Sequence, residues 1–140
     1  MALEVFINFK GNCREALDFY AEVFKTNIEG LMTYGDAPPE DGYVAPESEK
    51  NKVMYASLHI SGSTVMFSDA PDGMPYNVGN NILLNVNVTE REEVERLFKV
   101  LNVDPNPHMP PQQTFFADYY AMAEDKFGII WNIIKQPCTE

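Results

Sequence analysis

Residues 12–25 read NCREALDFYAEVFK, and residues 89–101 read TEREEVERLFKVL. In both stretches the apolar side chains recur at intervals of three and four residues, which places them on one face of an α-helix. Asn12 is a candidate N-cap for the first helix, and Thr89 and Glu92 form a T-x-x-E capping box for the second. The sequence therefore predicts two amphipathic helices of similar design.

A strand-like stretch stands before each predicted helix. Residues 4–9 form the first, and residues 81–88, in which apolar side chains alternate with others, form the second. Further extended stretches follow each helix: residues 28–34, 52–60 and 64–68 after the first, and a short strand near Val103 with residues 114–123 and 129–135 after the second. The order of one strand, one helix and three strands therefore occurs twice, which indicates an internal repeat of architecture.

The repeat divides the chain into two βαβββ modules of an α+β protein. Module one spans about residues 1–70 and module two about residues 80–136, and both are expected within one domain of residues 1–140. Stretches rich in Pro, Gly, Asn or acidic residues are predicted loops: residues 36–51, 69–79 and 104–113. The first of these is too long for a tight hairpin and is either a flexible excursion or a flap over a pocket.

The composition is typical of a globular domain with an acidic surface. Hydrophobic residues make up 45% of the 140 residues, which is enough for one continuous core. The formal net charge of −11 would repel phosphate backbones and anionic lipid, so we expect no nucleic-acid partner. The longest apolar runs fall far short of the roughly 20 residues that cross a bilayer, so we expect no membrane segment.

The N-terminus and the cysteines indicate a cytoplasmic protein. Residues 1–6 lack the basic and apolar regions of a signal peptide and resemble a first strand. Cys13 and Cys138 show neither C-x-x-C spacing nor a zinc-ligand pattern, which fits a reducing compartment. Cys13 stands at the start of a helix, where the helix dipole lowers the pKa of a thiol, but no paired histidine is visible and a structural role is expected.

Three motifs follow one another along the chain: Phe19-Tyr20-x-x-x-Phe24, GSTVMFSD at residues 62–69, and DKFGIIWNI at residues 125–133. In these motifs the chain resembles the PhnB-like branch of the vicinal oxygen chelate superfamily, which includes glyoxalases, bleomycin-resistance proteins and extradiol dioxygenases. The resemblance covers nearly the whole sequence. It implies the glyoxalase/bleomycin-resistance fold, in which paired βαβββ modules form curved mixed sheets around a cavity, commonly in a homodimer.

The resemblance also implies where a metal would bind. Metal-using members of the superfamily hold a divalent ion with His and Glu side chains from the first and last strands of the two modules. The corresponding positions fall at or near residues that are poor ligands for such an ion: Val5, Asn132, and the group of Asn81, Asn85 and Asn87, with Asp69 the one acid at a strand end. We therefore expect neither a metal nor another cofactor, and a divalent metal is the alternative if these positions are misaligned.

Two predicted strands carry the candidate ligand-binding residues. In the first, Tyr55, Ser57 and His59 share one face by strand periodicity, and apolar residues occupy the other. In the second, Asp118 and Tyr120 share a face, and a carboxylate in such an aromatic strand needs a partner or water. Many PhnB-like sequences have a histidine where this chain has Tyr55. No catalytic residue is assigned.

The sequence leaves three functions open. The first is a metal-independent small-molecule binding protein, or an enzyme of undetermined reaction, that uses a cavity lined by Tyr55, Ser57, His59, Asp118 and Tyr120. The second is a divalent-metal-dependent enzyme of the glyoxalase or dioxygenase type. The third is a drug-binding protein like the bleomycin-resistance members, whose acidic surface attracts a cationic ligand. In each case the expected partners are a small molecule and a second copy of the chain.

Overall fold

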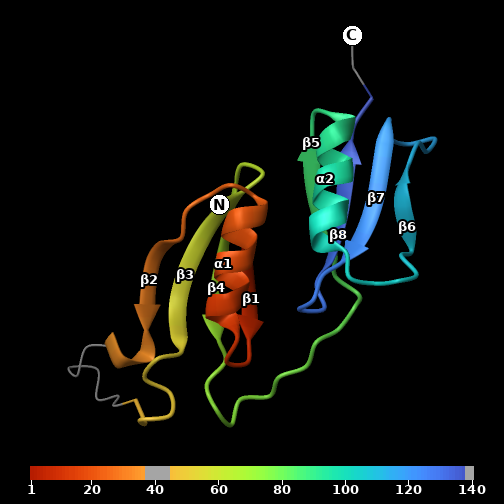
Figure 1. Ribbon diagram of the computed structural model, residues 1–140. Coiled ribbons are helices and arrows are strands. Elements are labelled where there is room, and N and C mark those ends of the chain that lie inside the picture. Colours follow the sequence, from red (N-terminus) through yellow and green to blue (C-terminus); the bar gives the residue numbers. More distant parts are fainter. Residues whose placement is uncertain (37–44, 138–140) are drawn as a thin grey trace. The chain divides into compact units, whose positions relative to one another are not determined.

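The computed structural model describes residues 1–36 and 45–137, which form two compact units (Figure 1). Unit 1 is Met1–Tyr76 and unit 2 is Asn77–Glu140. Each unit has its own sheet and its own helix. That both units act as one domain stays a prediction. Half of the loop predicted over residues 36–51, residues 37–44, lies outside the described residues, so whether it is a flap or a flexible excursion stays open as well.

Unit 1 is a four-stranded mixed sheet with one α-helix on one face. Its elements are β1 (Val5–Phe9), α1 (Cys13–Val23), β2 (Glu29–Thr33), the short 3-10 helix η1 (Tyr34–Asp36), β3 (Val53–Ile60) and β4 (Ser63–Asp69). The strand order is β1-β4-β3-β2, with β1 parallel to β4 and the other pairs antiparallel. After β1 the chain passes through α1 to β2 at the far edge of the sheet, and β3 and β4 then lead back until β4 lies beside β1 (Figure 1).

Unit 2 repeats this topology element for element. Its elements are β5 (Leu84–Val88), α2 (Arg91–Leu101), β6 (Met109–Gln112), β7 (Tyr119–Glu124) and β8 (Ile130–Lys135). The strand order is β5-β8-β7-β6, and β5 is again the strand that pairs in parallel with the last one. The predicted α+β class and the repeated βαβββ order are therefore confirmed.

Each helix packs its apolar face on one side of its own sheet. In unit 1 the Tyr20 ring of α1 lies 5.9 Å from the Phe67 ring of β4, and both side chains are fully buried. In unit 2 Leu97 and Leu101 of α2 and Ile133 of β8 are buried in the same way. Burying side chains of this size contributes about 1.5–3 kcal/mol each, so each apolar face stabilises the fold of its own unit.

The second strand of module two was placed incorrectly by the sequence. A strand was expected near Val103, which makes one backbone hydrogen bond to Glu124 O but belongs to no strand. The strand is β6 instead, which lies within the predicted loop 104–113 and reads Met-Pro-Pro-Gln. Proline has no N–H to give to a ladder and is tolerated at the edge of a sheet, where β6 stands.

The predicted helix caps differ from the structure. α2 begins at Arg91 with Glu90 as its N-cap, and no side chain caps its first turn, so the predicted Thr89–Glu92 capping box is wrong. α1 has the predicted N-cap, Asn12, but the Asn12 side chain makes no capping hydrogen bond there. The first amide of α1 is satisfied instead by an acid from β4, described below.

Among the described residues, no helix is both long enough and apolar enough to cross a membrane.

Candidate functional site

The predicted two faces of β3 are confirmed by the burial of its side chains. Ala56 and Leu58 are fully buried on the side of α1, whereas Tyr55 is 36% exposed on the opposite face of the sheet. Ser57 is nearly covered, at 9% exposure, and His59 is exposed. The three predicted residues of this strand therefore share the face that α1 does not cover, which we call the open face of unit 1.

His59 lies between two polar side chains of the neighbouring strands. Its Nε2 is 3.6 Å from Glu29 Oε2 on β2, and its Nδ1 is 3.5 Å from the Thr64 hydroxyl on β4. Both His59 and Glu29 are more than half exposed, so this contact is a surface pair worth well under 1 kcal/mol. The arrangement orients the imidazole without burying it.

Tyr120 lies on the corresponding open face of unit 2 and is only 6% exposed. Its hydroxyl donates a hydrogen bond to Asn132 Oδ1 of β8 at 2.6 Å. The Phe116 ring packs edge-on against it, with centroids 5.2 Å apart. Burial raises the pKa of the Tyr120 phenol, so the hydroxyl stays a hydrogen-bond donor across the neutral range.

The register of the two sheets makes Tyr55 and Tyr120 equivalent. Ala56 pairs with Phe67, and Ala121 pairs with Ile133, in the same part of each sheet, and each tyrosine directly precedes its alanine. The Tyr120 hydroxyl is bound to Asn132, but the Tyr55 hydroxyl has no hydrogen-bond partner within residues 1–36 and 45–137. The repeat therefore holds one phenol in place and leaves its counterpart available.

Asp118 does not lie where the sequence placed it. It precedes β7 by one residue, so the predicted mid-strand position on the same face as Tyr120 is wrong. Its carboxylate lies 2.8 Å from Arg91 Nη2 at the start of α2 and 2.7 Å from Lys135 Nζ at the end of β8. Arg91 first, and Lys135 after it, hold the pKa of Asp118 well below its usual range. Asp118 thus joins a helix start to a strand end.

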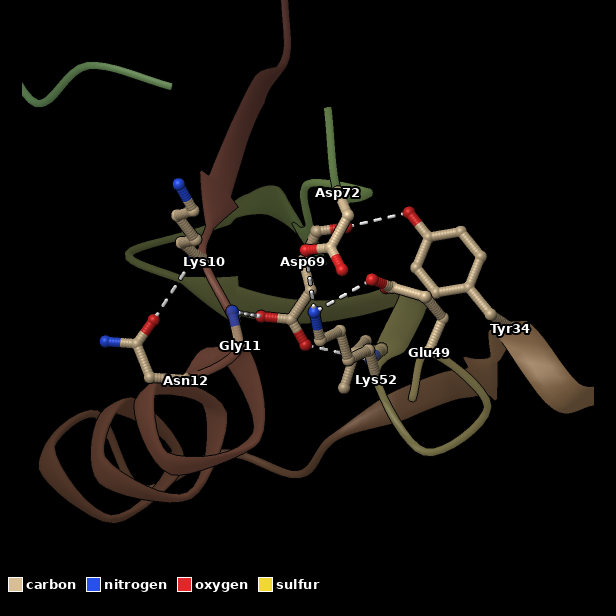
Figure 2. A network of polar contacts seen from close by, with 9 residues as sticks. Lys10, Gly11, Asn12, Tyr34, Glu49, Lys52, Asp69 and Asp72 are labelled. Carbon is tan, nitrogen blue, oxygen red and sulfur yellow. Dashed lines mark hydrogen bonds and ion pairs between the residues drawn. The ribbon is translucent and has the colours of Figure 1, made fainter. Parts of the chain in front are cut away.

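Sequence reasoning missed the role of Asp69, which is buried at the end of β4. Its Oδ1 accepts a hydrogen bond from the Gly11 amide at 2.8 Å (Figure 2). The same Oδ1 accepts the Cys13 amide at 2.9 Å, and Oδ2 accepts the Val53 amide at 2.9 Å. The Tyr34 hydroxyl donates to the Asp69 carbonyl at 2.7 Å. One side chain therefore ties together the ends of three strands and the first turn of α1.

Two further groups border this network. Lys52 Nζ lies 3.0 Å from Glu49 Oε1 and 3.4 Å from Asp72 Oδ1, beside Asp69 (Figure 2). Cys13 is fully buried, and burial first, then the Asp69 charge, raises the pKa of its thiol. A thiol held in its protonated form is a poor nucleophile, which agrees with the structural role expected for Cys13.

Asp125 has a similar role in unit 2. Its Oδ1 accepts the amides of Phe127 at 2.9 Å and Ile129 at 3.0 Å, and its Oδ2 accepts the Trp131 indole N–H at 2.9 Å. The turn also needs Gly128, whose φ of +86° is unfavourable for other residues. The motif at residues 125–133 therefore builds the β7–β8 turn.

The residues at the implied metal positions do not fit a divalent ion. Both carboxylate oxygens of Asp69 accept hydrogen bonds from backbone amides, and Asn132 Oδ1 accepts one from the Tyr120 hydroxyl. Val5 has no donor atom. Within the part of the chain that the structure describes, no group of three or more His, Cys, Asp or Glu side chains is arranged to hold a metal.

Known proteins are similar to this chain over nearly its whole length. Residues 2–134 match the model of the family described as 3-demethylubiquinone-9 3-methyltransferase. The chain is 29% identical to Protein YjdN of Escherichia coli K12 over 153 residues, with both proteins fully covered. It is 30% identical to protein PA1353 of Pseudomonas aeruginosa, whose crystal structure gives a TM-score of 0.84 and covers 97% of this chain and 98% of its own.

Two more distant structures share the fold. A PhnB protein from Bacillus cereus is 22% identical, with a TM-score of 0.76 and coverage of 96% of this chain and 99% of its own. A glyoxalase/bleomycin resistance protein/dioxygenase family enzyme from Burkholderia phytofirmans PsJN is 17% identical, with a TM-score of 0.61 and coverage of 96% and 97%. At these identities the likeness shows the fold alone, and it confirms the predicted fold class.

Proposed function

The chain belongs to the PhnB-like family described as 3-demethylubiquinone-9 3-methyltransferase, and on this premise we propose that it binds a small organic molecule without the help of a metal ion. Each unit offers a candidate binding surface of its own, the open face of its sheet. Its candidate ligand contacts are Tyr55, Ser57 and His59 in unit 1 and Tyr120 in unit 2. Asp118 supports the second surface by fixing the start of β7 rather than by touching the ligand.

One observation carries this proposal. The Tyr55 hydroxyl stands on an exposed sheet face with no hydrogen-bond partner within the described ranges, beside Ser57 and His59 of the same strand. A phenol joins a broad apolar ring to a polar tip, so it suits contact with an organic ligand. The equivalent Tyr120 is already bound to Asn132, which argues that the lack of a partner is particular to Tyr55.

Methyl transfer, which the family description names, is not part of the proposal. A nucleotide-like cofactor is typically held by a glycine-rich turn between a strand and a helix, where free backbone amides face the ligand. Here the β1–α1 turn is Lys10-Gly11-Asn12, and the Gly11 amide is bonded to Asp69. Membership of a family and a fold does not by itself fix a reaction.

The proposal is tested by NMR of the isotope-labelled full chain, with a set of neutral and charged aromatic molecules added in the presence and absence of EDTA. We expect amide shift changes on β3 and β7 that EDTA leaves unchanged. Tyr55→Phe should weaken the shifts on β3, whereas Tyr34→Phe, which alters a phenol bonded to Asp69, should not. Binding that disappears with EDTA would return the metal-dependent alternative to first place.

We also infer a homodimer in a reducing compartment. The inference of a dimer rests on the exposed apolar side chains of the open faces, such as Phe6 and Met32 in unit 1 and Phe116 in unit 2. The compartment rests on Cys13, which is a free, buried thiol. Light scattering that gives the mass of one chain at micromolar concentration would contradict the dimer, and a fluorescent fusion outside the cytoplasm would contradict the location.

A further inference from the structure

The open face of unit 2 carries a row of uncharged amides. β5 and β8 form the parallel pair at one edge of the sheet (Figure 1). Asn85 on β5 and Asn132 on β8 are register partners in this pair. Adjacent strands stand about 4.8 Å apart, so the two side chains are neighbours on one surface. Across the sheet, Met122 of β7 is the register partner of Asn132, and Met109 of β6 is the register partner of Met122.

Hydrogen bonds within this face engage one end of each amide. The Tyr120 hydroxyl donates to Asn132 Oδ1, which leaves the Asn132 NH₂ group as the available end. Asn85 Nδ2 donates one of its two hydrogens to Asn87 Oδ1 at 3.3 Å, and Asn85 Oδ1 accepts no hydrogen bond from the described residues. Neither the Asn132 NH₂ group nor Asn85 Oδ1 has a hydrogen-bond partner within the described residues.

The result is a donor beside an acceptor, with no net charge. We propose that this pair, here called the Asn85–Asn132 pair, selects a neutral planar ligand that carries a carbonyl and an N–H on the same edge, such as a lactam. The ligand carbonyl accepts from the Asn132 NH₂ group, and the ligand N–H donates to Asn85 Oδ1. The proposal rests on the proposed function above, because it names the ligand chemistry for one of the two open faces.

The neighbours of the pair suit the body of such a ligand. Met122 and Met109 offer polarisable thioethers, which pack well against unsaturated rings. The Phe116 ring, edge-on to Tyr120, is 47% exposed and adds an aromatic surface on the same unit. An anionic ligand is disfavoured, because Asn85 presents a lone-pair oxygen and the pair itself carries no positive charge.

The test uses two ligands that differ by one methyl group and two variants that carry the same chemical change. The probes are 2-quinolinone, whose carbonyl and N–H are adjacent, and N-methyl-2-quinolinone, whose donor is blocked. The variants are Asn132→Asp, which replaces the donor with an acceptor, and Asn85→Asp, which keeps an acceptor. Asn80→Asp, an exposed loop position of unit 2, controls for added charge.

Binding is followed by NMR titration of the full chain, including the side-chain amide signals. We expect 2-quinolinone to shift the Asn132 side-chain signal and N-methylation to weaken binding about tenfold. Asn132→Asp should weaken 2-quinolinone binding by a similar factor, whereas Asn85→Asp and Asn80→Asp should leave it within about twofold. The opposite expectations for the two variants separate loss of the donor from loss of fold.

Three results would overturn the proposal: equal affinity for both probes, equal loss in both aspartate variants, or no shift on unit 2. If shifts then occur on β3 alone, the proposed function survives and only the Asn85–Asn132 pair is refuted. If no aromatic molecule shifts either sheet, the proposed function fails as well.

Discussion

The Asp69 carboxylate accepts the backbone N–H of Cys13 at 2.9 Å, so an acid at the end of β4 satisfies the first amide of α1 from 56 positions along the chain. A capping side chain normally comes from the residue just before the helix. Here the cap is supplied by tertiary structure, and the same carboxylate also holds Gly11 and Val53. The N-terminus of α1 is therefore fixed only when β4 is in place.

Asp69→Ala is expected to lower the free energy of unfolding by about 3 kcal/mol or more, because three backbone amides, two of them in buried hydrogen bonds, lose a charged acceptor at once. The measurement is urea unfolding followed by circular dichroism. Asp72→Ala is the matched control, since its carboxylate is largely exposed and contacts side chains only, among them Lys52. A change for Asp69→Ala no larger than that for Asp72→Ala would contradict the role of Asp69.

The end of unit 2 that corresponds to Asp69 is built with the charges reversed. Asp69 is the register partner of Phe9 in the β1–β4 pair, and Lys135 is the register partner of Val88 at the equivalent position of the β5–β8 pair. The basic residue of unit 2 thus stands where unit 1 has an acid, and it forms an ion pair with Asp118 just before β7. The Asp118 pKa is lowered in the folded protein by Arg91 and Lys135. Its ionised form therefore stabilises the fold at a pH above the unfolded value of about 4, and this contribution is lost as the pH falls below it.

Asp118→Asn should accordingly flatten the acid limb of the stability profile. We expect the difference between wild type and Asp118→Asn to be present at pH 7 and to shrink as the pH falls toward 3. Urea unfolding at a series of pH values measures it, with Asp104→Asn, in the exposed 102–106 turn, as the control for removing one acid. A constant difference across this range would mean that the carboxylate charge is not what Arg91 and Lys135 recognise.

The equivalent tyrosines allow a direct comparison of a bound and an unbound hydroxyl. Tyr120→Phe removes the hydrogen bond to Asn132 from a buried phenol and should cost about 1 kcal/mol of stability. Tyr55→Phe should cost less than about 0.5 kcal/mol, because no protein group in the described ranges meets its hydroxyl. Thermal and urea unfolding of both variants check this. Equal losses would show that the Tyr55 hydroxyl has a structural partner.

Two glycines with nearly the same φ allow the cost of backbone strain to be measured apart from the cost of steric crowding. Gly11 has a φ of +88° with no atom within 4 Å of an added Cβ, whereas Gly128 has a φ of +86° and its Cβ would meet Val78 Cγ1 at 3.0 Å. Gly11→Ala should cost about 1 kcal/mol from conformation alone. Gly128→Ala should cost more, because Val78 must shift as well. If urea unfolding gives the same loss of stability for both variants, Val78 moves aside at no cost in free energy.

The sequence predicts the elements better than the contacts between them. Helical periodicity identifies Leu97 and Leu101 as one buried face because that pattern is local. The role of Asp69 depends on the amides of residues 16 to 58 positions away, which no local pattern reveals. β6 was missed because two prolines in a row are typical of a loop, and only its place at the sheet edge permits a strand.

The candidate site was predicted in part for the same reason. Strand alternation correctly placed Tyr55 and His59 on the face away from the helix, since that depends on period-two geometry within one strand. It misplaced Asp118, because the pairing with Arg91 and Lys135 joins three elements. The Asn132–Tyr120 hydrogen bond joins two strands whose register follows only from the folded sheet.

Cys13 provides a chemical measure of how firmly α1 is held. Its thiol is fully buried, and burial together with the Asp69 charge raises its pKa, so the reactive thiolate is scarce in the folded protein at neutral pH. In a Cys138→Ser background, which leaves Cys13 as the one cysteine of the sequence, Ellman's reagent should label it only as fast as the unit opens. Sub-denaturing urea should raise the rate in step with the measured stability, and Asp69→Ala should raise it further. Labelling at the rate of a free thiol in native buffer would contradict the protection of Cys13, and an unchanged rate in Asp69→Ala would mean that α1 does not need Asp69 to stay closed.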